Sequence, residues 1–143
     1  MSRGASIAYW MIRVLLGVLI FGAGLGKALD VGGFVEVMRS YDLALPEGLY
    51  WPGAYATILF ELVLGAWVLA GWRLTIAGAL AVLMHSGYLL LLSSALWRGL
   101  ELDNCGCFGV FLARPLRWYS PIEDFALIVV SFVLVVLAER RSA

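Results

Sequence analysis

Long apolar runs alternate with short polar segments along the chain. Four runs have about the 20 residues that an α-helix needs to cross a bilayer, at about 1.5 Å per residue. We expect membrane-spanning helices at about residues 7–26, 53–70, 74–96 and 122–138. Only Gly71–Arg73 separate the second run from the third, so we expect these two to form an antiparallel hairpin. The pattern predicts an all-α fold, a polytopic membrane four-helix bundle, with residues 1–143 forming a single transmembrane domain.

Two connections carry patterns of their own. From Asp30 to Leu45, apolar residues recur every three or four positions, which predicts a short amphipathic helix on the membrane surface that ends at Pro46. The connection before the fourth run closes with Ser120, Pro121 and Glu123, which read as a capping box with proline at the first helical position.

The composition supports a membrane protein. Hydrophobic residues make up 63% of the chain and charged residues 14%, against about 25% charged residues in a typical soluble domain. Ten Lys and Arg residues balance ten Asp and Glu residues, which leaves no basic surface for a nucleic acid. The expected surroundings are therefore a lipid bilayer, with no nucleic-acid partner.

An even number of spans places both termini on the same side of the membrane. The cationic residues of the connections are divided almost equally between the two sides. We expect an inner (plasma) membrane protein with cytoplasmic termini and with its cysteines on the outer, oxidising face. The first run should remain as a span rather than act as a signal peptide, because no small-x-small cleavage site precedes Lys27.

The cysteines, Cys105 and Cys107, are separated only by Gly106. Two thiols this close can react with a partner and then with each other, and glycine tolerates the backbone torsions that such a ring requires. The alternatives are two unpaired buried thiols or a soft Cu(I) ion held by the two sulfurs. Zinc is not expected, because it needs four ligands and the one histidine, His85, lies in a span.

Several motifs carry a family resemblance. They are Arg13-x3-Gly17, Gly22-x-Gly24-x-Gly26-Lys27-x2-Asp30 followed by Phe34, Tyr41-x-Leu43-x2-Pro46, Glu61-x3-Gly65 and Cys105-Gly106-Cys107-Phe108-Gly109. Together they resemble the MauE branch of the DoxX-like membrane proteins. The resemblance implies a four-helix membrane bundle that serves thiol–disulfide chemistry. It also implies a part in maturing the disulfide-rich small subunit of methylamine dehydrogenase, alongside a thioredoxin-like partner.

Similar four-helix bundles suggest an electron acceptor. The DsbB and vitamin K epoxide reductase groups pass electrons between cysteines and a quinone, although they use two cysteine pairs where this chain has one. The resemblance thus favours a membrane thiol–disulfide oxidoreductase. Cys105 and Cys107 would exchange disulfides with a thioredoxin-like extracytoplasmic protein or a cysteine-rich substrate, and a quinone (ubiquinone or menaquinone) would take the electrons. The direction of electron flow and the order of attack stay open.

Two rival functions belong to other classes. The bundle could be a non-enzymatic assembly factor that docks a redox protein, with its cysteines serving only as an anchor. It could also be a carrier that hands over Cu(I) from the cysteine pair.

Three ionisable residues fall inside the apolar runs, where a charge costs about 2.5–3.5 kcal/mol on insertion scales. They are Arg13, Glu61 and His85. Counting about 1.5 Å per residue gives them similar depths, so we expect an Arg13–Glu61 contact with His85 nearby. This pair could pin the first two spans together, or Glu61 or His85 could carry protons for quinone reduction.

Further residues could serve the same site. Lys27, where the first span reaches the outer face, could lower a thiol pKa or polarise a quinone carbonyl, or could simply extend its ammonium to the surface. Arg98 and Arg114 flank the cysteines as alternative cations, and Phe34 and Phe108 could shield a quinone ring. Gly22 and Gly26 have the spacing that lets helix backbones approach closely.

Overall fold

The computed structural model describes residues 3–142 of the chain. Within that range it confirms the all-α prediction, and four of the helices are long and apolar enough to cross a membrane. The elements in chain order are α1 (Arg3–Ala28), α2 (Val31–Ser40), the 3-10 turn η1 (Glu47–Leu49), α3 (Tyr50–Ala70), α4 (Leu74–Trp97) and α5 (Ser120–Ser142).

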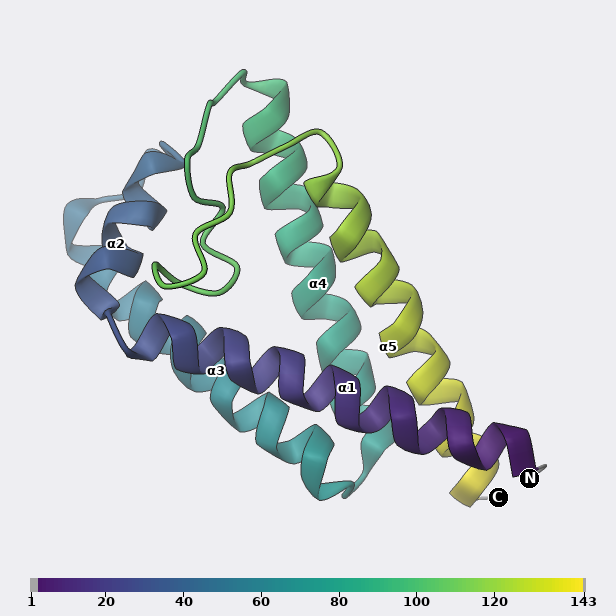
Figure 1. Cartoon of the computed structure of the whole chain (residues 1–143). Helices are drawn as coiled ribbons and strands as arrows, with labels where there is room; N and C mark the ends of the chain where they lie inside the picture. Colours follow the sequence, from purple (N-terminus) through teal and green to yellow (C-terminus); the bar gives the residue numbers. More distant parts are fainter. Residues whose placement is uncertain (1–2, 143) are drawn as a thin grey trace.

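The four long helices form two closely packed pairs. Helix α1 packs against α3 and helix α4 against α5, whereas α3 and α4 share fewer contacts. Figure 1 shows α3 and α4 joined by a tight turn and diverging from it. The turn reverses the chain because Gly71 adopts a left-handed backbone (φ 80°). The expected hairpin is therefore antiparallel, but its two helices find their main packing partners elsewhere.

Glycines let α1 and α3 approach closely, but these glycines are Gly24 and Gly65 and not the predicted Gly22 and Gly26. A side chain at Gly24 would lie 3.0 Å from Glu61, and one at Gly65 would lie 2.5 Å from the backbone of Phe21. Gly22 has nothing within 4 Å of its missing side chain. The expectation that Gly22 and Gly26 serve helix packing was wrong, because Gly22 points away and Gly26 contacts a loop instead.

The largest buried apolar cluster lies in the half of the bundle that contains the termini. There the four long helices bury a cluster of apolar side chains: Tyr9, Leu16, Ile20, Leu64, Val68, Leu74, Ala77, Ala81 and Leu134. The outer surfaces of the same helices remain apolar, with Met11 68%, Leu83 67% and Leu90 72% exposed. Exposed apolar side chains on all sides of a bundle are typical of contact with lipid. The protein is a multi-pass membrane protein.

The short helix α2 was predicted correctly, but not its end. Asp30 caps it by accepting a hydrogen bond from the Gly33 N–H at 2.8 Å. The helix ends at Ser40 instead of reaching Pro46, because Asp42 and Ala44 take left-handed backbone conformations. Its buried side chains, Phe34 and Val35, pack with residues of α3, so α2 covers one end of the bundle.

Helix α5 begins at Ser120, close to the predicted position, but without the predicted capping box. The Ser120 hydroxyl accepts a hydrogen bond from the Arg117 N–H at 3.0 Å. The Glu123 carboxylate instead accepts a hydrogen bond from Arg114 at 2.7 Å. The arginine of the preceding loop thus takes the carboxylate that a capping box would have used.

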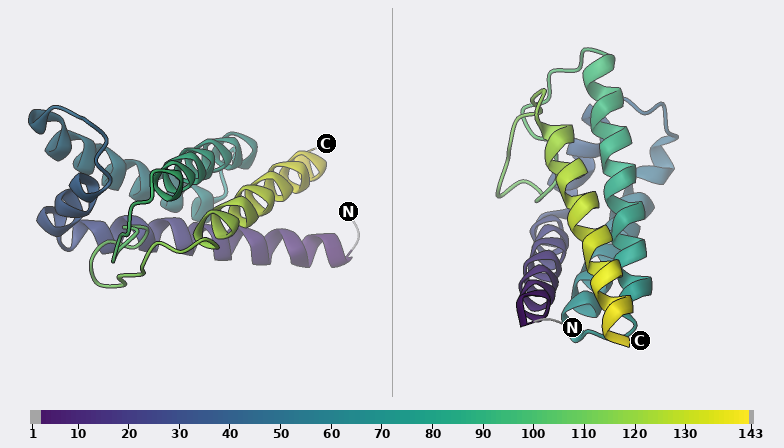
Figure 2. Two further views of the ribbon diagram at one scale, coloured as in Figure 1. Left: turned by 90° about the horizontal axis from the view of Figure 1, so that it is seen from above. Right: turned by 90° about the vertical axis from the view of Figure 1, so that its right-hand side faces the viewer.

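The two termini lie at the same end of the bundle, as four crossings require (Figure 1). The long loop between α4 and α5 lies at the opposite end, beside α2 (Figures 1 and 2). This loop carries both cysteines.

Candidate active site

Hydrogen bonds between the two arms of the cysteine loop, residues 102–105 and 114–116, fix its backbone. The Cys105 N–H donates to the Arg114 carbonyl at 2.7 Å, and the Leu116 N–H donates to the Leu102 carbonyl at 2.9 Å. From the end of α2, the Tyr41 hydroxyl donates to the Cys105 carbonyl at 2.6 Å. Burial raises the pKa of Tyr41, so this hydroxyl keeps its proton and remains a donor.

Glycines let this loop turn tightly and lie against α1. Gly106 and Gly109 both have positive φ angles, 77° and 74°, a conformation that residues with a side chain rarely adopt. Asn104 accepts the Gly106 N–H at 2.9 Å and donates its amide to the Gly109 carbonyl at 3.0 Å. A side chain at Gly26 would lie 2.3 Å from the Phe108 carbonyl oxygen. The motif glycines of α1 and of the loop are therefore adjacent in space.

The two cysteines are half-buried free thiols whose sulfurs are 3.0 Å apart. This is about 1 Å longer than a disulfide bond. The hydrogen bond from Cys107 lowers the pKa of Cys105 to about 6, and the charge of Arg114 acts in the same direction. The same hydrogen bond and burial raise the pKa of Cys107. The pair therefore has one sulfur, Cys105, that carries a thiolate at neutral pH.

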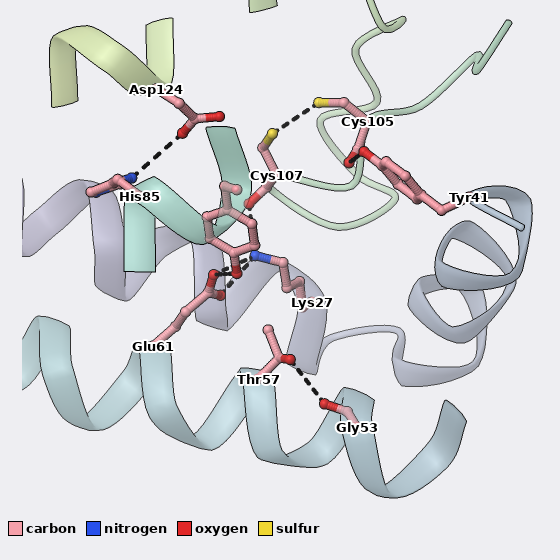
Figure 3. Close-up of polar contacts among 10 residues, drawn as sticks. Lys27, Tyr41, Gly53, Thr57, Glu61, His85, Cys105, Cys107 and Asp124 are labelled. Carbon is pink, nitrogen blue, oxygen red and sulfur yellow. Dashed lines mark hydrogen bonds and ion pairs between the residues drawn. The ribbon is translucent and has the colours of Figure 1, made fainter. Parts of the chain in front are cut away.

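Lys27 and Glu61 form a fully buried ion pair beneath this loop. The Lys27 ammonium lies 2.7 Å from each Glu61 carboxylate oxygen and 2.9 Å from the Cys107 carbonyl oxygen (Figure 3). The Tyr88 hydroxyl also donates to Glu61. Lys27 is 0% exposed, so its ammonium does not extend to the surface. The interpretation in which Lys27 extends its ammonium to the surface is thus wrong, and the residue belongs to the interior of the site.

The predicted Arg13–Glu61 contact is wrong. Arg13 donates to the carbonyls of Val68 and Leu69 at the end of α3, with its Nε 3.1 Å from the Val68 oxygen. Its guanidinium also lies over the Trp10 ring. Arg13 thus satisfies free carbonyls at the C-terminus of a helix, where a cation is favourable. It plays no part in the arrangement around the cysteines.

His85 pairs with a residue that the sequence did not single out. Its Nδ1 lies 3.5 Å from a carboxylate oxygen of Asp124, in the first turns of α5 (Figure 3). That distance is an ionic contact but too long for a good hydrogen bond. Neither His85 nitrogen has a hydrogen-bond partner among the described residues, although the side chain is buried.

A cavity of about 360 Å³ brings these groups together. Its volume lies in the range of small-molecule sites. Much of its wall is apolar, from residues of α1, α4 and α5. The polar lining residues, with the two cysteines, are Glu61, His85, Tyr88, Cys105, Cys107, Arg114, Ser120, Glu123 and Asp124.

The four residues suggested for holding a quinone divide between two cavities. Phe108 and Arg114 line the large cavity. Lys27 and Phe34 line a second, smaller one of about 100 Å³ beneath α2, and Cys105 and Cys107 line both. Arg98, proposed as another cation, donates to the carbonyls after α2 at 2.7 and 2.9 Å and does not line either cavity.

Sequence reasoning gave no role at the site to Tyr41, Tyr88 or Asp124, although Tyr41 belongs to one of the family motifs. Tyr88 looks like an ordinary apolar position of α4, and Tyr41 follows directly after α2. Asp124 stands out in retrospect as an acidic residue followed directly by a long apolar run. A carboxylate at that position faces a bilayer or a buried site, and either makes it a functional candidate.

The model of the family "Methylamine utilisation protein MauE" matches residues 5–138, which is most of the chain. The chain belongs to the MauE family. No curated protein and no solved structure matches it. The MauE match includes the ion pair, the His85–Asp124 contact and the cysteine loop, so the whole site lies within the region that defines the family.

Proposed function

We propose that this MauE-family protein is a membrane thiol–disulfide oxidoreductase that supports the maturation of a disulfide-containing protein. The family name connects it with methylamine utilisation, and the proposed beneficiary is the disulfide-rich small subunit of methylamine dehydrogenase. The resemblance to the DoxX-like membrane proteins, which the motifs carry together, is part of the same proposal. The observation that carries it is the Cys105–Cys107 pair, with sulfurs 3.0 Å apart in a loop whose backbone is already fixed.

The two sulfurs have different tasks in this proposal. Cys105 bears the negative charge, because its pKa is lowered to about 6. It is the attacking thiolate when the pair is reduced and the leaving thiolate when the disulfide is broken, since a thiol of lower pKa leaves faster. Cys107, beside the cavity, closes the disulfide. Lys27 holds the Cys107 carbonyl at 2.9 Å and so positions this second sulfur.

A complete cycle oxidises a partner and reduces a quinone. The partner's dithiol loses two protons and gives two electrons to the Cys105–Cys107 disulfide, which yields a partner disulfide and the reduced pair here. The reduced pair then passes two electrons to a ubiquinone or menaquinone, which also takes up two protons, and the disulfide forms again. The apolar wall of the large cavity, which includes Phe108 and the α1 residues Leu19 and Ala23, suits a quinone ring.

The partner is expected on the outer side of the inner membrane. The cysteine loop lies at the end of the bundle opposite to both termini, so cytoplasmic termini place the thiols in the oxidising compartment. A thioredoxin-like extracytoplasmic protein or a cysteine-rich substrate would dock there.

Mixed-disulfide trapping tests the exchange step. In Cys107→Ser, the Cys105 thiolate can still attack the disulfide of an oxidised partner and release the partner's other sulfur as a thiolate. No neighbouring thiol can then break the mixed disulfide, so a covalent complex with the partner should accumulate in cells. Cys105→Ser should trap less, because burial still raises the pKa of the remaining Cys107 thiol once the contact with Cys105 is gone. A lack of any complex in both variants would refute the exchange chemistry.

The double variant distinguishes catalysis from scaffolding. If Cys105→Ser/Cys107→Ser still supports maturation at the native level, the protein is a non-enzymatic assembly factor. Loss of maturation with the protein folded and membrane-inserted supports the oxidoreductase.

A further inference from the structure

His85 is a buried histidine without the hydrogen bonds that burial normally requires. It is 5% exposed, and both ring nitrogens lack a partner among the described residues. Burying a polar group without a hydrogen bond is unfavourable, and most such groups in proteins are paired. Such a group on the wall of a cavity is therefore placed to bind something that enters the cavity.

The neighbours of His85 determine what that ligand meets. Asp124, 7% exposed, lies nearest to Nδ1, at 3.5 Å. This leaves Nε2 for the ligand. The ionisable groups that line the cavity with His85 are Glu61 of α3, Tyr88 of α4, Cys105, Cys107 and Arg114 of the loop, and Glu123 and Asp124 of α5.

The other ionisable groups of the cavity are already engaged. Both Glu61 oxygens accept hydrogen bonds from Lys27, and Tyr88 donates to one of them. Arg114 is paired with Glu123 at 2.7 Å. The two sulfurs contact each other. Among the described lining residues, His85 thus combines an exchangeable proton with free hydrogen-bonding positions.

We infer that His85, oriented by Asp124, is the group that binds the carbonyl oxygen of the electron acceptor in the large cavity and gives it a proton. This inference rests on the proposed function and names the acceptor by its chemistry, a lipophilic dicarbonyl ring such as a quinone. Imidazole readily exchanges a proton near neutral pH.

The proton balance follows from the cycle. At neutral pH the pair is a Cys105 thiolate and a Cys107 thiol, so forming the disulfide releases two electrons and one proton, and the second proton that the ring needs comes from water. The ring takes both electrons, and its two carbonyl oxygens become hydroxyls. His85 donates one of the two protons at the oxygen it binds and regains one from the Cys107 thiol, so the imidazole ends the turnover as it began.

A single-turnover measurement tests this role. The full chain is reduced in lipid nanodiscs and mixed with a short-chain benzoquinone, and the loss of free thiol is followed over a range of pH. His85→Gln keeps a hydrogen-bond donor but cannot transfer a proton, so the rate should fall by about 10²–10⁴-fold, the usual contribution of a general acid. Ser86→Ala, one residue along α4 and hydrogen-bonded within its own helix, is the matched control and should react at the native rate.

The pH profile separates proton transfer from a structural role. If His85 supplies the proton, the rate of the native protein should depend on pH in a way that the rate of His85→Gln does not. A His85→Gln protein with the native rate and the native profile would overturn the inference.

A second reaction separates this inference from the proposed function. Oxidised glutathione exchanges with the cysteine pair without using an acceptor in the cavity. A native protein that reacts with glutathione but not with the benzoquinone would overturn the role of His85 and leave thiol–disulfide exchange standing. A native protein that reacts with neither would refute the proposed function itself.

Discussion

Two pairs of ionisable side chains are buried near the cysteines, and they differ in how completely they are hydrogen-bonded. In the first pair, Lys27 lies 2.7 Å from both Glu61 oxygens and also reaches the Cys107 carbonyl. In the second, His85 and Asp124 approach only to 3.5 Å, and the imidazole makes no hydrogen bond among the described residues. The geometry of the fully hydrogen-bonded pair suits a structural role, and the geometry of the loosely bonded pair suits ligand binding.

The positions of the pairs agree with this division. Lys27 of α1 and Glu61 of α3 connect the first helix pair, and Tyr88 links them to α4 of the second pair. The ion pair thus connects the two helix pairs of the bundle. Lys27 also holds the cysteine loop through its hydrogen bond to the Cys107 carbonyl. His85 and Asp124 lie within the second helix pair alone, on the wall of the cavity.

The largest expected effect comes from breaking the first pair. Glu61→Ala leaves the Lys27 ammonium buried without its counter-ion, so the free energy of unfolding should fall by about 3–5 kcal/mol. Thermal unfolding in detergent micelles measures it. Lys27→Met/Glu61→Leu removes both charges and should recover most of that loss. A Glu61→Ala protein as stable as the native one would show that the pair does not hold the helices together.

Tyr88→Phe should have the next largest effect on the free energy of unfolding. It removes the hydroxyl that donates to Glu61, and hydrogen bonds to charged groups contribute about 1.5–3 kcal/mol. The same unfolding measurement detects the change. Tyr55→Phe, on the exposed face of α3, is the matched control and should leave the stability unaltered. Equal stabilities of the two variants would contradict the proposed link between the helix pairs.

The reactivity of Cys105 should depend on pH. Because the pKa of Cys105 is lowered to about 6, the thiolate is present above that pH and is lost below it. Alkylation of Cys105 by iodoacetamide should therefore slow by about tenfold between pH 7.5 and pH 5. Peptide mass spectrometry distinguishes the two cysteines. A midpoint near 8.5, the value of an ordinary thiol, would contradict the assignment of the thiolate.

The smallest expected effect on stability comes from the second pair. Asp124→Asn removes a carboxylate that makes no close hydrogen bond with His85. The free energy of unfolding should change by less than about 1 kcal/mol, far less than for Glu61→Ala under the same conditions. A loss as large as that of Glu61→Ala would show that both pairs are structural.

The spans and the cysteine loop could be predicted from the sequence because each depends on local properties. Apolar length identifies a membrane helix, and glycines beside two cysteines identify a tight turn. The partners of the buried charges could not be predicted in the same way. Counting residues along α1 gives the depth of Arg13 but not the direction of its side chain, which turns by about 100° with each residue.

Lys27 illustrates the same limit. Its place at the end of an apolar run suggested a side chain at the membrane surface, yet α2 and the cysteine loop cover this end of α1 and enclose the ammonium. The contact that decides its partner, with Glu61, spans 34 positions in sequence. Such contacts depend on how whole helices pack, which no local pattern of residues specifies.

The hydrogen bonds of the cysteine loop have a consequence for rate. Two thiols free in solution must meet by diffusion, and the entropy lost in that meeting adds to the barrier for joining them. In this protein hydrogen bonds with Tyr41, Asn104 and Arg114 hold the peptide before Gly106, and Lys27 holds the Cys107 carbonyl after it. The ordering is completed once, when the chain folds, so each later closure of the ring requires motion of little more than two side chains.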